Sequence, residues 1–123
     1  MTTILLISAG GFLGANVRFA MATWSRRRFG ERFPVGTLLA NLTGSFLIGL
    51  ILGSVDDRDV RLLLATGFLG AETTFSAFAV ETVALTDRGE RGRAVANVIA
   101  NGAGSLAAAA GGLVMAWLIR ELT

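Results

Sequence analysis

The order of apolar and polar residues divides the chain into four apolar runs separated by short charged segments. The runs cover about residues 3–23, 35–55, 61–85 and 94–119. Each is long enough for a helix to cross the roughly 30 Å hydrocarbon layer of a bilayer. The pattern therefore predicts an all-α integral membrane protein, multi-pass, with four transmembrane helices in a single domain over residues 1–123.

Residues at the ends of the runs indicate where the helices begin and end. Trp24 and Trp117 suit the headgroup layer, where an indole has one wet and one apolar side. Pro34 predicts the start of the second helix, because proline is best tolerated in the first helical turn. Residues 25–33 are polar with two phenylalanines, which predicts a loop or a short interfacial helix.

The third run contains residues that a lipid-facing helix does not favour. Residues 67–78 read GFLGAETTFSAF, with two glycines, one carboxylate and a cluster of hydroxyl groups. At this depth irregular backbone survives only beside protein, water or an ion. The sequence therefore predicts that the third helix is broken near Gly70 to Thr73.

Composition narrows the function classes. The chain is 53% hydrophobic and has no cysteine and no histidine, which removes disulfides, thiol nucleophiles and the usual zinc chemistry. No base lies beside a nucleophile in a defined site, so we expect no enzyme. All eleven basic residues are arginine, mostly in segments between the runs, where they set topology. We therefore expect no nucleic-acid partner.

The arginines are divided unequally between the two sides of the membrane. Seven lie in the first and third connections and three on the other side: Arg26, Arg27, Arg28, Arg32, Arg88, Arg91 and Arg93 against Arg58, Arg61 and Arg120. The positive-inside rule then places the first and third connections in the cytoplasm and both termini outside.

Polar residues follow helical spacing inside two of the runs. The two stripes, each spaced i, i+4, i+8, are Thr37, Asn41 and Ser45, and Asn97, Asn101 and Ser105. Such side chains either join helices by hydrogen bonds or line a path for a polar solute, and the spacing leaves both open. Small residues at four-residue spacing, such as Gly10 and Gly14, predict close helix packing, with a second copy needed to bury these short helices.

Phe75 and Phe78 are three residues apart and project from one side of the third helix, near the hydroxyl groups of Thr74 and Ser76. Phenylalanine in a membrane helix ordinarily contacts lipid or core. The alternative is that the positive ring edges meet a small anion, with hydroxyl and amide groups as further donors. Arg18 must snorkel, pair with an acid or face a wet cavity.

Three stretches together resemble the Fluc/CrcB fluoride channels. They are GGFLGANVR (residues 10–18), PVGTLLANLTGSFLIG (34–49), and GFLG with TTFS and a following phenylalanine (67–78). The resemblance implies an antiparallel dual-topology dimer in the inner (plasma) membrane, with two pores that export fluoride passively from the cytoplasm. The partner is then an identical copy or an oppositely oriented homologue, and the unequal arginines favour the homologue.

The same resemblance assigns roles to residues of this chain. It makes Phe75 and Phe78 the pore phenylalanines, Asn41 the pore amide, and Thr74 and Ser76 part of the polar lining. Arg18 and Glu81 match an arginine and an acid of the family's motifs. Ala77 stands where the family usually has threonine.

The resemblance also implies a structural sodium ion at the dimer interface, held by the backbone carbonyls of Gly70 and Thr73. Glu72 stands between these two ligands, where an apolar residue is usual. Three alternatives are open for its carboxyl group: it is protonated, it contributes to cation binding, or it pairs with a basic residue of another helix.

Two other function classes remain for comparison. Small multidrug resistance proteins are also four-helix antiparallel dimers, but they carry an essential glutamate in the first helix, whereas no acid occurs here before Glu31. A non-transporting assembly subunit would use the small-residue faces only to bind partner helices.

Overall fold

The structure, a computed structural model, describes residues 1–122, which are helical apart from short connections. Within these residues four helical runs are long and apolar enough to cross a membrane: Thr2–Phe29, Val35–Ser54, Arg58–Asp87 and Arg91–Leu122. The predicted all-helical class and the predicted number of spans are therefore confirmed. Residue 123, the end of the predicted domain, lies outside the described residues.

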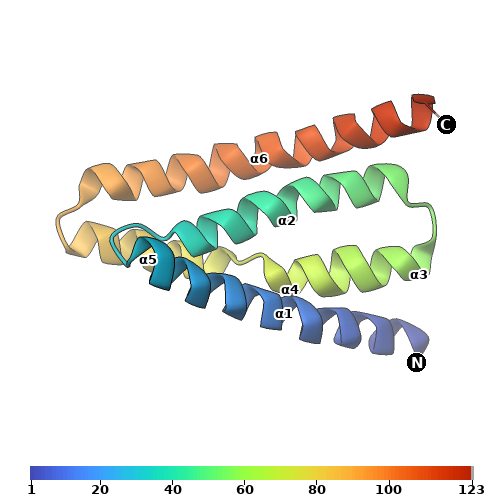
Figure 1. Cartoon of the computed structure of the whole chain (residues 1–123), viewed down its shortest axis with the longest axis horizontal. Coiled ribbons are helices and arrows are strands. Elements are labelled where there is room, and N and C mark those ends of the chain that lie inside the picture. The colour runs from blue at the N-terminus through green and yellow to red at the C-terminus, as the bar shows by residue number, and fades with distance from the viewer. Residues whose placement is uncertain (123) are drawn as a thin grey trace.

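The helices run back and forth across one bundle. They are α1 (Thr2–Phe29), α2 (Val35–Ser54), α3 (Arg58–Arg61), the π-helical segment η1 (Leu62–Leu69), α4 (Gly70–Glu72), α5 (Phe75–Asp87) and α6 (Arg91–Leu122). Both termini lie at the same end as α3, and the α1–α2 and α5–α6 connections lie at the other end (Figure 1). The main contacts are α6 along α2, and α1 against η1 and α4.

Glycines set the distance between neighbouring helices. A Cβ atom at Gly49 of α2 would collide with the carbonyl oxygen of Ala109 on α6. A Cβ atom at Gly14 of α1 would collide with the carbonyl oxygen of Phe68 in η1. The small residues therefore bring helix backbones into contact as predicted, and this packing is the main cohesive term where lipid is as apolar as leucine.

Helix α1 is longer than the sequence pattern predicts. It continues to Phe29 and not to about residue 23, so the prediction of a separate loop or interfacial helix is wrong for residues 25–29. Arginine is a good helix former, and nothing in this stretch stops the helix. The stop comes at Gly30, which has a φ of 75° and whose N–H donates to the Arg26 carbonyl at 2.9 Å.

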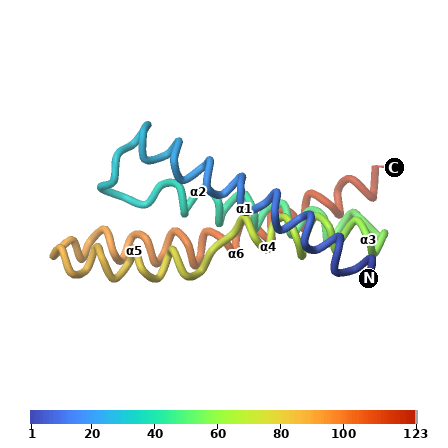
Figure 2. Tube along the Cα trace, turned by 90° about the horizontal axis from the view of Figure 1, so that it is seen from below, coloured from blue at the N-terminus to red at the C-terminus, as the bar shows by residue number. Residues whose placement is uncertain are grey.

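The predicted break in the third span is present, at the far end of the predicted stretch. Gly70 is helical, with φ −63° and ψ −29°, and the helix continues to Glu72. The extended residues are Thr73 and Thr74, with ψ values of 156° and 118°. Beyond the break α5 runs beside α6, away from the α1–α2 connection (Figure 2). The π-helical segment before the break was not predicted.

Candidate functional site

The side chain of Asn41, on α2, holds the break in the third span. Its amide oxygen accepts a hydrogen bond from the Thr74 N–H at 2.8 Å, and its amide nitrogen donates to the Thr74 carbonyl at 3.1 Å. Both backbone groups of Thr74 are therefore paired although the helix is interrupted there. In a continuous helix the Thr74 N–H would donate to the Gly70 carbonyl instead, so the break deprives that carbonyl of its helical donor.

A chain of hydrogen bonds continues from Asn41 through α6 to α5. Asn41 also donates to the amide oxygen of Asn101 at 2.8 Å, and Asn101 donates to the Asn97 side chain at 2.9 Å. Asn97 donates to the Thr82 hydroxyl at 2.9 Å, which in turn donates to the Phe78 carbonyl at 2.8 Å. The two polar stripes therefore join helices at their asparagines, while Ser45 and Ser105 take no part in the chain.

Phe75 and Phe78 follow the break directly, in the first turn of α5. Their ring centroids are 5.5 Å apart and their planes meet at 61°, so an edge of one ring faces the other. Thr74 caps α5, because its hydroxyl accepts from the Ala77 N–H at 3.2 Å, and the same hydroxyl lies 3.3 Å from that of Ser76. The four predicted pore residues of this segment therefore form one cluster.

A cavity of about 260 Å³ with a mainly apolar wall adjoins this cluster, between α1, α2 and α5. Arg18, Thr37, Thr74, Ala77 and Glu81 are part of its wall. A second cavity of about 210 Å³ shares Thr37 and Glu81 and leads toward the α1–α2 connection. The Thr37 hydroxyl donates to Glu81 at 2.7 Å, while the other Glu81 carboxylate oxygen is buried without a hydrogen-bond partner. Arg18 therefore lies in the wall of a cavity, which is one of the three alternatives given for it.

Glu72 is buried between α4 and α2. Its side chain lies over Gly44, where a Cβ atom would be 2.5 Å from one carboxylate oxygen. That oxygen is buried and has no hydrogen-bond partner, and only 3% of the residue is exposed. Residues 1–122 contain no cluster of three side chains of the metal-binding types, so a cation beside Glu72 would need backbone carbonyls as further ligands.

Thr82 is the member of the site that the sequence reasoning missed. Thr74, Phe78 and Thr82 are spaced by four residues, and this spacing on one helix face is the signal that could have found it. Its importance depends on Asn97, which is completely buried and has Thr82 as the acceptor for its amide nitrogen. That pairing follows from how α5 packs on α6.

Residues 5–113 match the family described as "CrcB-like protein, Camphor Resistance (CrcB)". The chain belongs to the CrcB family. The matched range includes every residue of the cluster, both cavities and the break, so the resemblance read from the motifs is confirmed.

Several relatives of this CrcB protein are similar over most of their length. A protein named "Fluoride-specific ion channel FluC", from Anaeromyxobacter dehalogenans, is 43% identical over 124 residues, covering 96% of this chain and 98% of the relative. A FluC protein of Agrobacterium fabrum is 41% identical over 94% of this chain and 96% of the relative. A "FluC 2" protein of Bacillus thuringiensis is 49% identical over 72% of this chain and 75% of the relative.

We expect the substitution Thr82→Val to destabilise this CrcB protein more than Thr86→Val does. Each threonine donates to the carbonyl four residues before it, at 2.8 and 3.0 Å, but Thr82 also accepts from the buried Asn97. Leaving that amide unpaired costs about 1–3 kcal/mol. Thermal unfolding of the two purified variants in detergent measures the difference, and equal losses would contradict the role of Thr82.

Proposed function

We propose that this CrcB protein is a fluoride-selective channel that gives passive export of fluoride from the cytoplasm across the inner membrane. The relatives named fluoride-specific ion channels support the ion, because two of them match almost the whole chain. The observation that carries the proposal is the cluster at the break. Two phenylalanine edges, two hydroxyls and an amide meet there beside a cavity, without a basic side chain among them.

The cluster offers fluoride weak donors that can be released again. The positive edges of Phe75 and Phe78 attract an anion without a formal charge. The hydroxyls of Thr74 and Ser76 are 3.3 Å apart, so only one of their two protons is used in the bond between them. Whichever hydroxyl donates, the proton of the other is free for an anion. Such a site binds strongly enough to admit fluoride and weakly enough to release it.

Asn41 takes part mainly as the residue that shapes this site. Its amide nitrogen already donates to the Thr74 carbonyl and to Asn101. An amide nitrogen has only two protons, so fluoride can receive one from Asn41 only when one of these bonds opens. Asn41 is therefore a positioning residue in the resting site and a donor during passage.

The cavities at Glu81 provide the route between the cluster and the end of the bundle that holds the α1–α2 connection. Thr37, Glu81 and Arg18 line it, and Thr74 and Ala77 form the wall next to the pore residues. Arg18 offers the positive charge that draws an anion into a low-dielectric space. Ala77, in place of the usual threonine, removes one hydroxyl from this wall.

A second chain is needed to complete the site. Phe75 is 79% exposed in the single chain, and Ser76 and Gly70 are exposed as well. Hydroxyl groups and a carbonyl without its helical donor are unfavourable against lipid. We therefore propose an antiparallel dimer in which the partner covers these residues, giving two pores for each dimer.

The charges at the two ends favour a homologue of opposite orientation as the partner. The end with the first and third connections holds seven arginines and three acids, and the other end holds three arginines and four acids, counting Glu31, Asp87 and Glu90 against Asp56, Asp57, Asp59 and Glu121. Such a chain inserts mainly in one orientation. A dimer of two opposite chains then requires a partner with the reverse bias.

A structural sodium ion between the two chains fits the break. The carbonyl of Gly70 has lost its helical donor, and Thr73, the second proposed ligand, is extended. We place the sodium ion at the carbonyl oxygens of these two residues. The buried carboxylate of Glu72 would add a negative charge beside them, which compensates the cation.

The other two function classes receive no comparable support. The described α1 helix carries no acid, so it lacks the feature by which a small multidrug exporter works. An assembly subunit would not need a helix break that pairs its backbone with a side chain.

Substitutions at the cluster test the pore. In liposomes that contain this protein together with its oppositely oriented partner, we expect Phe75→Ile, Phe78→Ile and Asn41→Asp each to reduce fluoride efflux at least tenfold while leaving the dimer intact. Phe12→Ile is the matched control, because Phe12 of α1 is also 70% exposed and lines neither the cluster nor the two cavities. A fluoride electrode measures the efflux, with chloride as the control ion. Unchanged efflux in all three variants would remove the pore assignment.

Expression of the chain alone tests the partner. We expect little fluoride efflux from liposomes that contain only this protein, and we expect accessibility labelling to find its first and third connections in the cytoplasm. Co-expression with an oppositely oriented homologue should restore efflux. Robust efflux from the purified single protein would show that identical copies suffice.

Thermal unfolding in different cations tests the sodium ion without relying on flux. We expect sodium to raise the unfolding temperature of the dimer relative to N-methylglucamine at equal ionic strength, because an ion that binds only the folded state stabilises it. Glu72→Gln should reduce this rise. The same unfolding temperature in both salts would contradict a bound sodium ion.

A further inference from the structure

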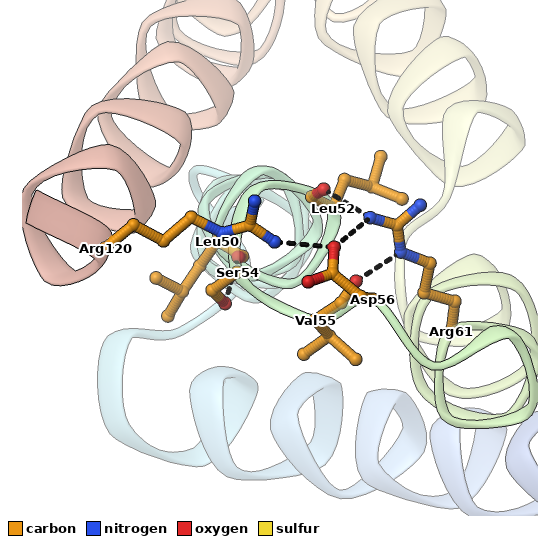
Figure 3. A network of polar contacts seen from close by, with 7 residues as sticks. All are labelled: Leu50, Leu52, Ser54, Val55, Asp56, Arg61 and Arg120. Carbon is orange, nitrogen blue, oxygen red and sulfur yellow. Dashed lines mark hydrogen bonds and ion pairs between the residues drawn. The ribbon is translucent and has the colours of Figure 1, made fainter. Parts of the chain in front are cut away.

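The arginines at the two ends of the bundle differ in whether they have acidic partners within the chain. At the end that holds both termini, Arg120 donates to Asp56 at 2.6 Å and Arg61 lies 3.9 Å from the same carboxylate (Figure 3). Arg61 also donates to the Leu52 carbonyl at 2.9 Å, at the end of α2. Arg58 pairs with Asp59 at 3.7 Å. All three arginines of this end therefore have acidic partners within the chain.

The opposite end has an excess of arginines without such partners. Arg88 and Arg93 share Glu90, and the hydrogen bond from Arg93 is the main cause that lowers the pKa of Glu90. Within residues 1–122 no acid pairs with the four arginines that we call the arginine end, which are Arg26, Arg27, Arg28 and Arg32. All four are exposed. Their charge is therefore available to a partner outside the chain.

Helix α1 carries three of these arginines to the depth of the lipid headgroups. The helix has 28 residues, so it is about 42 Å long, whereas the hydrocarbon layer is about 30 Å thick. Trp24 and Phe29 flank the arginines, are 54% and 50% exposed, and meet edge to face with ring centroids 5.6 Å apart. Aromatic rings of this kind mark the interface between hydrocarbon and headgroups. This geometry places the guanidinium groups between them within reach of lipid phosphates.

We propose that the arginine end binds the headgroup of an anionic phospholipid in the leaflet next to the α1–α2 connection. The phosphodiester supplies the negative charge that the chain itself does not provide. A guanidinium group presents paired N–H donors that match two phosphate oxygens, and Arg28 also lies over the ring of Phe29, 5.5 Å from its centroid. Clusters of about four or more arginines immediately beside a membrane span are attracted to anionic lipid.

This binding is more than the orientation signal that the same arginines give during insertion. Orientation needs only positive charge in the connection, whatever the lipid around the finished protein. The proposed site instead requires that anionic lipid is enriched beside the inserted protein. Arg26 lines the cavity that leads to the pore cluster, so the bound headgroup lies beside the cavity mouth.

The two tryptophans provide a separate reporter at each end. Trp24 lies beside the arginine end, and Trp117 lies on α6 shortly before Arg120 and is 59% exposed. Trp117→Phe leaves Trp24 as the only tryptophan, and Trp24→Phe leaves Trp117. Brominated lipids quench tryptophan fluorescence on contact. The probes are brominated phosphatidylglycerol and brominated phosphatidylcholine, at equal mole fraction in phosphatidylcholine liposomes that contain the full chain.

We expect brominated phosphatidylglycerol to associate with Trp24 about fivefold more strongly than brominated phosphatidylcholine, and Trp117 to show a smaller preference. In the Trp117→Phe background, the triple substitution of Arg26, Arg27 and Arg28 to Gln should abolish the preference at Trp24. Arg58→Gln, at the opposite end, is the matched control and should leave it unchanged. Size-exclusion profiles identify any variant that fails to fold, and single substitutions then replace the triple.

Two results would overturn the proposal. Equal quenching of Trp24 by the two lipids would show that no headgroup is selected. A preference that survives the arginine substitutions would place its cause elsewhere. Inorganic phosphate distinguishes the sources of the ligand: if it removes the preference more strongly than sodium chloride of the same ionic strength, the site takes free phosphate and not lipid.

Discussion

The pair of hydrogen bonds between the Asn41 side chain and the backbone of Thr74 is the interaction on which the rest of the site depends. Inside a bilayer an interrupted helix exposes N–H and carbonyl groups that no water can satisfy. One carboxamide side chain satisfies both groups of Thr74, with bonds of 2.8 and 3.1 Å. Because of it, Thr74 can cap α5 and direct Phe75 and Phe78 to one side, and the Gly70 carbonyl loses its helical donor.

Close packing of the α2 and α6 backbones and the buried amides of α6 hold the Asn41 side chain in place. Gly49 lets α2 and α6 approach so closely that a Cβ atom would collide, and Asn41 then reaches Asn101 across the contact. The chain of hydrogen bonds continues from Asn101 to Asn97, which is fully buried, and from Asn97 to Thr82 of α5. Hydrogen bonds therefore join the cluster to α2 and α6, and no water is present in the hydrocarbon layer to replace their partners.

Local sequence signals predicted the parts of this structure that depend on one helix at a time. Apolar runs located the spans, glycines located the close contacts, and the hydroxyl-rich stretch located the break. The prediction of a loop or a short interfacial helix after Trp24 is wrong for residues 25–29, because charge marks the end of the hydrocarbon layer and not the end of a helix. The π-helical segment and the pairing of Asn97 with Thr82 depend on how two helices register, which spacing along one helix does not contain. The pore and cation roles of the cluster residues stay predictions, since they rest on the family's motifs.

The hydrogen bonds already made within the cluster would let the proposed pore conduct fluoride and still hold its shape. Fluoride gives up strong hydration on entering, so a site with no donors would exclude it, and a site with a buried cation would trap it. In the proposed pore an anion would receive one free hydroxyl proton and, for a moment, an amide proton that Asn41 otherwise gives to Asn101 or Thr74. A hydrogen bond to the anion is charge-assisted and stronger than the neutral bond that it replaces, which offsets part of the hydration that fluoride loses. When the anion leaves, the same bonds re-form and restore the break.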